Sequence, residues 1–233
     1  MRHFLKLTCS LTLLAIMVLA CKEDKKDKST EAATAEQEAS ATEEVQEVTK
    51  SEMTTVLNAN LATEEDLKAI GISDEMVEKI VKSRPFLTMT DFNSLFGSEV
   101  NTSELYKKMF VPFNLNTTAE ADFKMIPGVG DRMAHEFEEY RPYVSLAQFR
   151  REIGKYVDET EVARYENYVF VPIELNTASE EMILALPGVG KRMAHEFEEY
   201  RPYKNMAQFR KEIGKYVDDK ELARLERFVY LKQ

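Results

Sequence analysis

Apolar residues recur at intervals close to 3.6 residues along short stretches of the chain from about residue 57 onward. Met133, Ala134, Phe137 and Tyr140 form one such stretch. Apolar positions at this spacing lie on one face of an α-helix, whereas a half-buried strand alternates apolar and polar residues. We find no alternating stretch of useful length. The pattern therefore predicts an all-α fold of short helices.

The helical pattern occurs three times, with a period near sixty residues. The segment 131–143 returns at 191–203 with only its first residue changed. A more diverged copy precedes these two, and in it we match Leu57-Asn58 with Leu115-Asn116. A unit of this size is small for an independent core, so neighbouring copies are expected to pack on one another. We predict three tandem units of about four short helices each: copy one at 53–113, copy two at 114–173 and copy three at 174–233.

Pairs of residues mark where the helices begin. A Ser, Thr, Asn or Asp followed three residues later by Glu or Gln is typical of a capping box. Such boxes predict helix starts at Thr117 and Thr177, at Ser145 and Asn205, and at Asp158 and Asp218. The second helix of copies two and three is expected to end at Arg141 or Arg201, because the following proline disfavours a helical conformation of the residue before it.

A Pro-Gly-Val-Gly turn separates the first and second helices of copies two and three, at 127–130 and 187–190. Together with the Leu-Asn-Thr opening and the Tyr-Arg stop, these turns resemble the helix-hairpin-helix units of the extracytoplasmic competence DNA-receptor family. Similar units occur in a photosystem extrinsic subunit and in secretion-system components. The resemblance therefore implies the fold more strongly than it implies a function.

The resemblance also implies a mode of DNA binding. In relatives that bind DNA, the turn and the start of the next helix hold a backbone phosphate without reading the sequence. Carried onto this chain, that role falls to Gly128, Val129, Gly130, Arg132, Gly188, Val189, Gly190, Lys191 and Arg192. In copy one, Ser73 replaces the second glycine and is expected to cap the helix instead.

The N-terminus has the pattern of a secretory signal. Residues 1–20 hold a short basic region and an apolar run that is too short to span a bilayer stably. The sequence Val18-Leu19-Ala20-Cys21 resembles the lipobox of bacterial lipoproteins, which implies that Cys21 is lipidated. The segment 21–52 has too few apolar residues to fold and is expected to be a disordered tether. We therefore expect a protein of the bacterial cell envelope that the lipid anchor alone holds to the membrane.

The residues directly after Cys21 refine the expected location. Lys22-Glu23-Asp24 resembles the surface-export signal of lipoproteins in some Gram-negative bacteria. The expectation is therefore an outer-membrane protein that is exposed at the cell surface.

The charge of the chain opposes binding to DNA. The full chain has 31 basic and 41 acidic residues, and loss of Arg2 and Lys6 with the signal leaves 29 against 41, a net charge of −12. DNA affinity depends largely on neutralising phosphates, so an acidic surface disfavours it. A basic group gathers in copy three, at Lys191, Arg192, Lys204, Arg210, Lys211 and Lys215.

No residue pattern indicates catalysis, a metal site or a cofactor. His135 and His195 lie near glutamates, but further ligands are lacking and zinc generally needs three or four. We expect them on an exposed, charged helix face. The tyrosines beside Pro142 and Pro202 are expected in a packed corner and not as stacking platforms for bases. The repeats account for the whole folded chain, so we expect no enzyme.

Two functions remain open. The first is a non-catalytic lipoprotein that binds the DNA backbone without sequence specificity, with a role in DNA capture or uptake. The second is a scaffold lipoprotein that binds another envelope protein and no DNA. A basic stripe that joins both glycine turns would favour the first function, whereas acidic side chains crowding the turns would favour the second.

Overall fold

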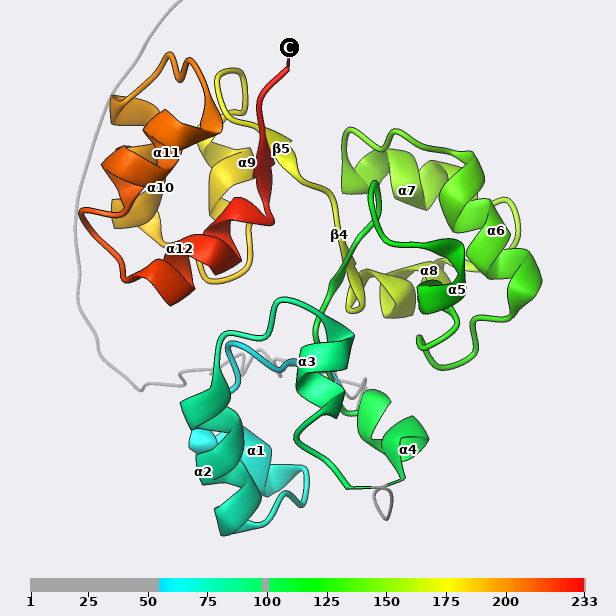
Figure 1. Ribbon diagram of the computed structural model, residues 1–233. Helices are drawn as coiled ribbons and strands as arrows, with labels where there is room; N and C mark the ends of the chain where they lie inside the picture. Colours follow the sequence, from blue (N-terminus) through cyan, green and yellow to red (C-terminus); the bar gives the residue numbers. More distant parts are fainter. Residues whose placement is uncertain (1–54, 98–100, 233) are drawn as a thin grey trace, which may run out of the picture. The chain divides into compact units, whose positions relative to one another are not determined.

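The computed structural model describes residues 55–97 and 101–232, which all fall in one unit at residues 50–233. The predicted signal, the lipidation of Cys21 and the tether lie outside the described residues. In the described part, three copies of one arrangement follow each other, each with four short helices and a pair of strands (Figure 1). The predicted fold class is confirmed. None of the described helices combines the length and apolar character that a membrane crossing requires.

The elements follow the same order in each copy. Copy one has β1 (Leu57–Asn58), α1 (Glu64–Ala69), α2 (Asp74–Ser83), α3 (Met89–Asn93), α4 (Thr102–Tyr106) and β2 (Met109–Phe110). Copy two has β3 (Phe113–Asn114), α5 (Glu120–Phe123), α6 (Asp131–Glu139), α7 (Leu146–Ile153), α8 (Glu159–Glu166) and β4 (Val169–Phe170). Copy three has β5 (Ile173–Glu174), α9 (Glu180–Leu184), α10 (Lys191–Glu199), α11 (Met206–Ile213), α12 (Asp219–Glu226) and β6 (Val229–Tyr230).

A short parallel strand pair closes each copy on itself. β1 pairs with β2, β3 with β4 and β5 with β6, so that the first residues of a copy lie beside its last ones. The sequence did not predict these strands. Each is two residues long, too short for an alternating pattern to be recognised.

The predicted caps of the third and fourth helices are confirmed. The side chains of Ser145, Asn205, Asp158 and Asp218 each accept a hydrogen bond from the backbone N–H three residues later, at 2.8 to 3.2 Å. These bonds satisfy amides that a helix start leaves without an acceptor. The local sequence therefore determines where these helices begin.

The predicted capping boxes at Thr117 and Thr177 are wrong. α5 begins after Ala119 and α9 after Ser179, whose hydroxyl accepts from the N–H of Met182 at 3.3 Å. Thr177 instead donates its hydroxyl to Glu174 at 2.7 Å. The threonines lie in a turn that precedes the helix, in which the N–H of residue 118 or 178 bonds to the carbonyl of residue 114 or 174.

The second helix ends two residues earlier than predicted. α6 and α10 stop at Glu139 and Glu199, and Tyr140 already leaves the helical conformation at ψ 11°. Arg141 lies beyond the helix, and its guanidinium donates to the carbonyls of Leu115 and Thr118. The peptide bond between this arginine and the following proline is cis in all three copies.

An asparagine and an arginine tie the start of each copy to the end of its second helix. The Asn116 side chain accepts from the N–H of Tyr143 at 2.7 Å and donates to its carbonyl at 2.8 Å. Arg141 donates to two carbonyls of the opening turn. The same bonds recur in copies one and three through Asn60 with Phe86, Arg84 with Ala59 and Ala62, Asn176 with Tyr203, and Arg201 with Leu175 and Ala178.

These bonds correct one match made from the sequence. The counterpart of Asn116 in copy one is Asn60, so the match of Leu57-Asn58 with Leu115-Asn116 is wrong by two residues. Copy one diverges enough that its one Leu-Asn pair suggested the wrong register.

The apolar helix faces form the core, as the spacing predicts. Phe137 is fully buried and meets Phe123 and Phe149 edge to face, with ring centroids 5.3 and 5.2 Å apart. Copies one and two share one apolar core, whereas copy three has its own. Phe170, the last residue of β4, packs on Phe228 of copy three with ring centroids 4.7 Å apart.

We expect Asn116→Ala to lower the free energy of unfolding by about 1–3 kcal/mol, because it removes two hydrogen bonds and leaves the Tyr143 amide and carbonyl without their partner. Urea denaturation followed by helical circular dichroism measures this. Asn167→Ala is the matched control, since Asn167 bonds only to carbonyls at the end of its own helix, and it should change stability by less than about 1 kcal/mol. Equal losses in the two variants would contradict the assigned role of Asn116.

Candidate nucleic-acid interface

The glycine turns of copies two and three have the same backbone. Gly128 and Gly188 have φ values of 81° and 75°, a left-handed conformation that glycine adopts without steric cost. Gly130 and Gly190 are the N-caps of α6 and α10, and nothing lies within 4 Å of a Cβ built on either. All four glycines are exposed.

The two valines of the turns do not present free amides. Val129 donates its N–H to the carbonyl of Ile126 at 3.0 Å, and Val189 donates to Leu186 at 3.1 Å. Both valine side chains are buried in the core. A role of these amides in holding phosphate, as the resemblance implies, does not fit this geometry.

The first turns of α6 and α10 keep their amides available. No side chain caps either helix, so their leading N–H groups point outward at the positive end of the helix dipole. In copy one, by contrast, the hydroxyl of Ser73 accepts from the N–H of Met76 at 3.4 Å. This confirms that copy one caps its second helix internally.

An arginine lies against each glycine turn of copies two and three, a role the sequence did not predict. The Arg224 side chain is 3% exposed, pairs with Glu221 at 2.6 Å and donates to the carbonyl of Pro187 at 2.7 Å. Arg164 pairs with Glu161 at the same distance but is 32% exposed. The Glu-x-x-Arg spacing recurs in both copies and could have indicated the pair, but not its contact with a turn 37 residues away.

The turn of copy three also touches copy one. A Cβ built on Gly188 would lie 2.8 Å from both the Arg224 guanidinium and the Cδ2 atom of Leu61. In copy two the closest atom to the equivalent point on Gly128 is Arg164 Nη2 at 3.1 Å. One side of the copy-three turn is therefore in protein contact, while Gly190 on its other side faces open space.

The charges at the two turns differ. In copy two, Asp131 pairs with Lys124 at 2.9 Å and the Arg132 guanidinium lies 5.5 Å from the centre of the Tyr156 ring. In copy three, Lys191 replaces the aspartate, and neither Lys191 nor Arg192 has an ion pair among the described residues. The turn of copy three is therefore cationic, whereas in copy two a carboxylate stands at the helix start.

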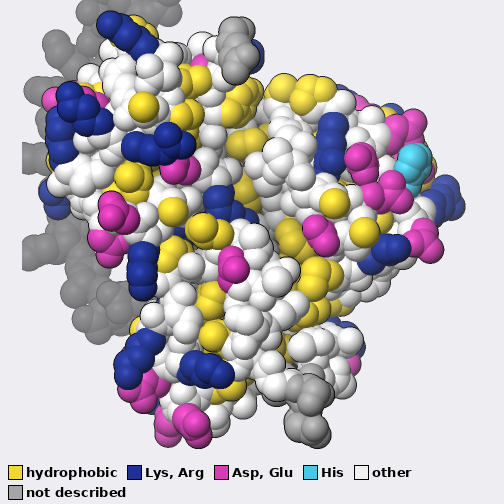
Figure 2. All heavy atoms as spheres, viewed as in Figure 1, with side chains coloured by type: hydrophobic (Ala, Val, Ile, Leu, Met, Phe, Trp, Pro, Cys, Tyr) yellow, Lys and Arg dark blue, Asp and Glu magenta, His cyan; other side chains and the backbone are white. Residues whose placement is uncertain are grey.

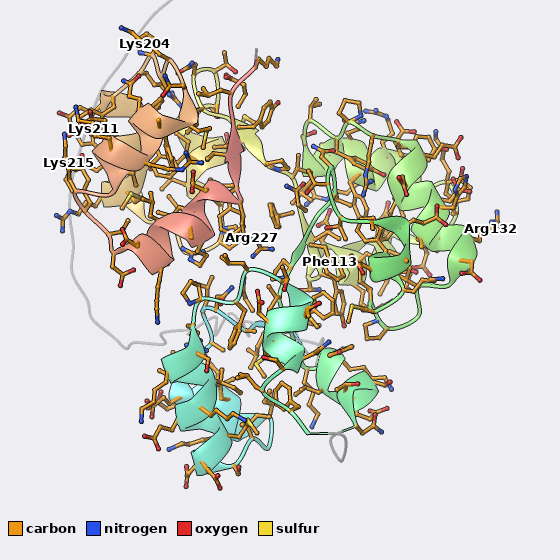
Figure 3. All side chains as sticks on the ribbon, viewed as in Figure 1. Phe113, Arg132, Lys204, Lys211, Lys215 and Arg227 are labelled. Atoms are coloured by element: carbon orange, nitrogen blue, oxygen red, sulfur yellow. The ribbon has the colours of Figure 1, made fainter. Side chains whose placement is uncertain are left out.

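Of the other four residues in the basic group predicted for copy three, three are paired. Arg210 lies 2.6 Å from Glu226, and Lys211 and Lys215 both lie near Glu212. Lys204 has no ion pair in the described part. Figure 2 shows Lys and Arg side chains over the helices of copy three, and Figure 3 shows Lys204, Lys211 and Lys215 along its outer side. Pairing with Glu212 and Glu226 leaves no continuous basic stripe.

The histidines lie on an exposed face, as predicted. His135 Nδ1 is 3.3 Å from a carboxylate oxygen of Glu120, and the hydrogen bond with Glu120 raises the pKa of the imidazole. His195 lies 3.7 Å from Glu199. Among residues 55–97 and 101–232, no group of three or more His, Cys, Asp or Glu side chains could hold a metal ion.

The tyrosines beside the prolines belong to the packed corner that the sequence predicted. Tyr143 and Tyr203 are buried, and burial raises the pKa of both hydroxyl groups. The Tyr140 and Tyr200 hydroxyls each bond to a second tyrosine at 2.7 Å. The Tyr143 and Tyr203 rings are therefore not accessible to a base, and a lysine Nζ lies 4.8 Å from the ring centre of Tyr140 and of Tyr200.

Residues 169–230 match the family model described as the helix-hairpin-helix motif. The match covers copy three, whose turn carries the unpaired cations, together with the last strand of copy two. The motif suggests non-specific binding to the DNA backbone. No curated protein and no solved structure matches the chain.

We expect Gly188→Ala to lower the free energy of unfolding by about 1–3 kcal/mol, because alanine is strained at this left-handed φ and its Cβ would displace Arg224 and Leu61. Gly190→Ala is the control, since its φ of −93° and the open space around it accept a methyl group. Its free energy of unfolding should fall by less than about 1 kcal/mol in the same urea titration, because alanine is a poorer N-cap than glycine. A larger loss for Gly190→Ala than for Gly188→Ala would contradict this description of the turn.

Proposed function

We propose that this protein binds the backbone of DNA without sequence preference through the glycine turn of copy three, and that it does so without catalysing a reaction. The observation that carries the proposal is the start of α10. There, uncapped amides, the exposed Gly190 and the unpaired cations of Lys191 and Arg192 meet. Amides at a helix start together with nearby cations are a recurring phosphate site.

The acidic net charge does not remove this site. Copy three has six basic side chains without a carboxylate partner among the described residues: Lys191, Arg192, Lys204, Lys220, Arg227 and Lys232. Copy two, counted in the same way, has only Arg132. Screening limits the reach of exposed charges to about 8 Å at physiological salt, so the cations beside the turn act on a phosphate more strongly than distant carboxylates do.

One observation favours the scaffold function instead. Leu61 packs on Gly188, so the glycine there also serves the close approach of protein groups. If the turns serve packing alone, the protein binds no DNA and its partner is another envelope protein.

DNA binding can be tested by exchanging the residues that copies two and three have at the start of their second helices. We expect Lys191→Asp, which gives copy three the residue of copy two, to weaken binding of a labelled duplex about tenfold and to lower the salt slope of log K by about one. Asp131→Lys should strengthen binding for the same reason. Fluorescence anisotropy of residues 22–233 across a salt titration measures both effects.

Lys211→Gln serves as the control for loss of charge, since Lys211 lies near Glu212, and it should bind like the wild type. Absence of duplex binding at low salt would rule out the DNA proposal and leave the scaffold function. If Lys191→Asp, Asp131→Lys and Lys211→Gln all bind the duplex as the wild type does, the duplex is bound at another surface.

We further propose that Cys21 is lipidated and that the protein is anchored in the bacterial outer membrane, exposed at the cell surface and acting in DNA capture. The support is the residue pattern around Cys21. Metabolic labelling with an alkyne fatty acid should mark the wild type, and Cys21→Ser should abolish the label and release the protein from the membrane fraction, since a lipid supplies the anchoring free energy. An unlabelled wild type would contradict the anchor.

A further inference from the structure

Two adjoining hollows flank the last strand of copy three. The larger one, of about 930 Å³, is lined by residues of all three copies, among them Leu87, Val144 and Arg227. The second one, of about 700 Å³, adds Lys204 and Met206. Both are lined by Glu226, Arg227, Val229, Tyr230 and Lys232, and neither contains a residue of the glycine turns. We call the two hollows together the β6 groove.

Apolar side chains stand exposed at the wall of the groove. Leu87 is 38% and Val144 is 62% exposed, and they are two of the four large apolar side chains that are exposed in the described part of the chain. Both line the larger hollow, as do Met125 and Pro142. A concave apolar surface with a few polar groups is the usual form of a binding site.

A recessed cation lies at the floor of the groove. Arg227 donates to the carbonyl of Pro112 at 2.8 Å, and its guanidinium lies 5.4 Å from the ring centre of Phe170. Burial lowers its pKa to about 10, with a smaller contribution in the same direction from Arg224. Figure 3 shows Arg227 on the inner side of copy three.

Arg227 has no carboxylate partner in the described residues. Of the acidic groups at the groove, Glu226 is paired with Arg210 at 2.6 Å. Asp122 lines the larger hollow, and Asp91 acts on Arg227 only at a distance. A partly desolvated cation without a counterion is unfavourable, and an incoming anion would stabilise it.

Copy two lacks the three cations of the groove. Lys204, Arg227 and Lys232 stand where copy two has Val144, Asn167 and Pro172, sixty residues earlier. The segment 147–158 differs from 207–218 at one position, which remains basic. The two copies thus diverge in charge at this surface, while the third helix and the turn after it stay nearly the same.

The strand at the centre of the groove has a free edge. β6 pairs only with β5 among the described strands. An edge without a neighbour can accept an extended segment through backbone hydrogen bonds. Both hollows share β6, so a ligand that fills both contacts this strand.

We propose that the β6 groove binds an extended acidic segment of a partner protein, with apolar side chains against Leu87 and Val144 and carboxylates at Arg227 and Lys232. The apolar walls distinguish this surface from the glycine turn of copy three. A phosphate of duplex DNA meets exposed cations in water, whereas Arg227 lies recessed between phenyl rings.

The test uses residues 22–233 and a labelled peptide of alternating glutamate and leucine, followed by fluorescence anisotropy. We expect binding in the micromolar range that weakens at least tenfold in Lys232→Gln and in Val144→Gln. Both positions are exposed, so these variants should fold as the wild type does, which circular dichroism checks. Lys191→Asp, at the glycine turn, should bind the peptide like the wild type.

Two control peptides separate the contribution of the carboxylates to binding from that of the apolar side chains. A peptide with glutamine in place of glutamate should bind at least tenfold more weakly, because it lacks the carboxylates. Polyglutamate should be weakened as much, because it lacks the apolar side chains. The proposal is overturned if polyglutamate binds as well as the mixed peptide or if no binding occurs at low millimolar peptide. It is also overturned if Lys232→Gln loses duplex DNA and not the peptide, which would assign the groove cations to nucleic acid.

Discussion

The fold of each copy depends on one pair of side chains that act over a distance. Asn116 matches both backbone groups of Tyr143, which lies 27 residues later, and Arg141 holds the two carbonyls of the turn that contains Asn116. Together they fix where the first helix begins and where the second helix ends. The glycine turn lies between these points and therefore takes the same backbone conformation in copies two and three. Burial of the aromatic core supplies stability, but these bonds determine the geometry.

Because of this constraint, the residues that maintain the fold of a copy are not the residues that set the charge of its glycine turn. The asparagine and the arginine recur in all three copies, while the residues at the exposed helix start change freely. At the N-cap, copy one has Ser73 where copies two and three have glycine. At the next position, Asp131 places a carboxylate in copy two and Lys191 places a cation in copy three. A repeat whose shape is set elsewhere can vary its binding surface without loss of fold. The exchange of Asp131 for Lys191 thus reverses the charge at the start of the second helix without a change in its backbone.

The parts of the structure that follow from local sequence could be predicted, and the parts that join distant residues could not. Apolar spacing gave the helices, and the caps at Ser145 and Asp158 gave their starts. The two-residue strands, the Asn116 bonds and the contact of Arg224 with Pro187 each join residues far apart in the chain. Thr117 has the spacing of a capping box but lies in the turn that Arg141 holds. Tertiary hydrogen bonds thus overrode a local signal.

Net charge is a poor guide to binding in this chain because ion pairs neutralise its charges unevenly. In copy two the carboxylates are matched to nearly every basic side chain, so that little positive charge is left to act on a ligand. In copy three two groups of cations lack a carboxylate partner, and their surroundings differ. Lys191 and Arg192 stand beside free amides in water, which suits a hydrated phosphate. Arg227 lies recessed among apolar walls, where a carboxylate carried by an apolar segment replaces the lost hydration better than a DNA backbone can.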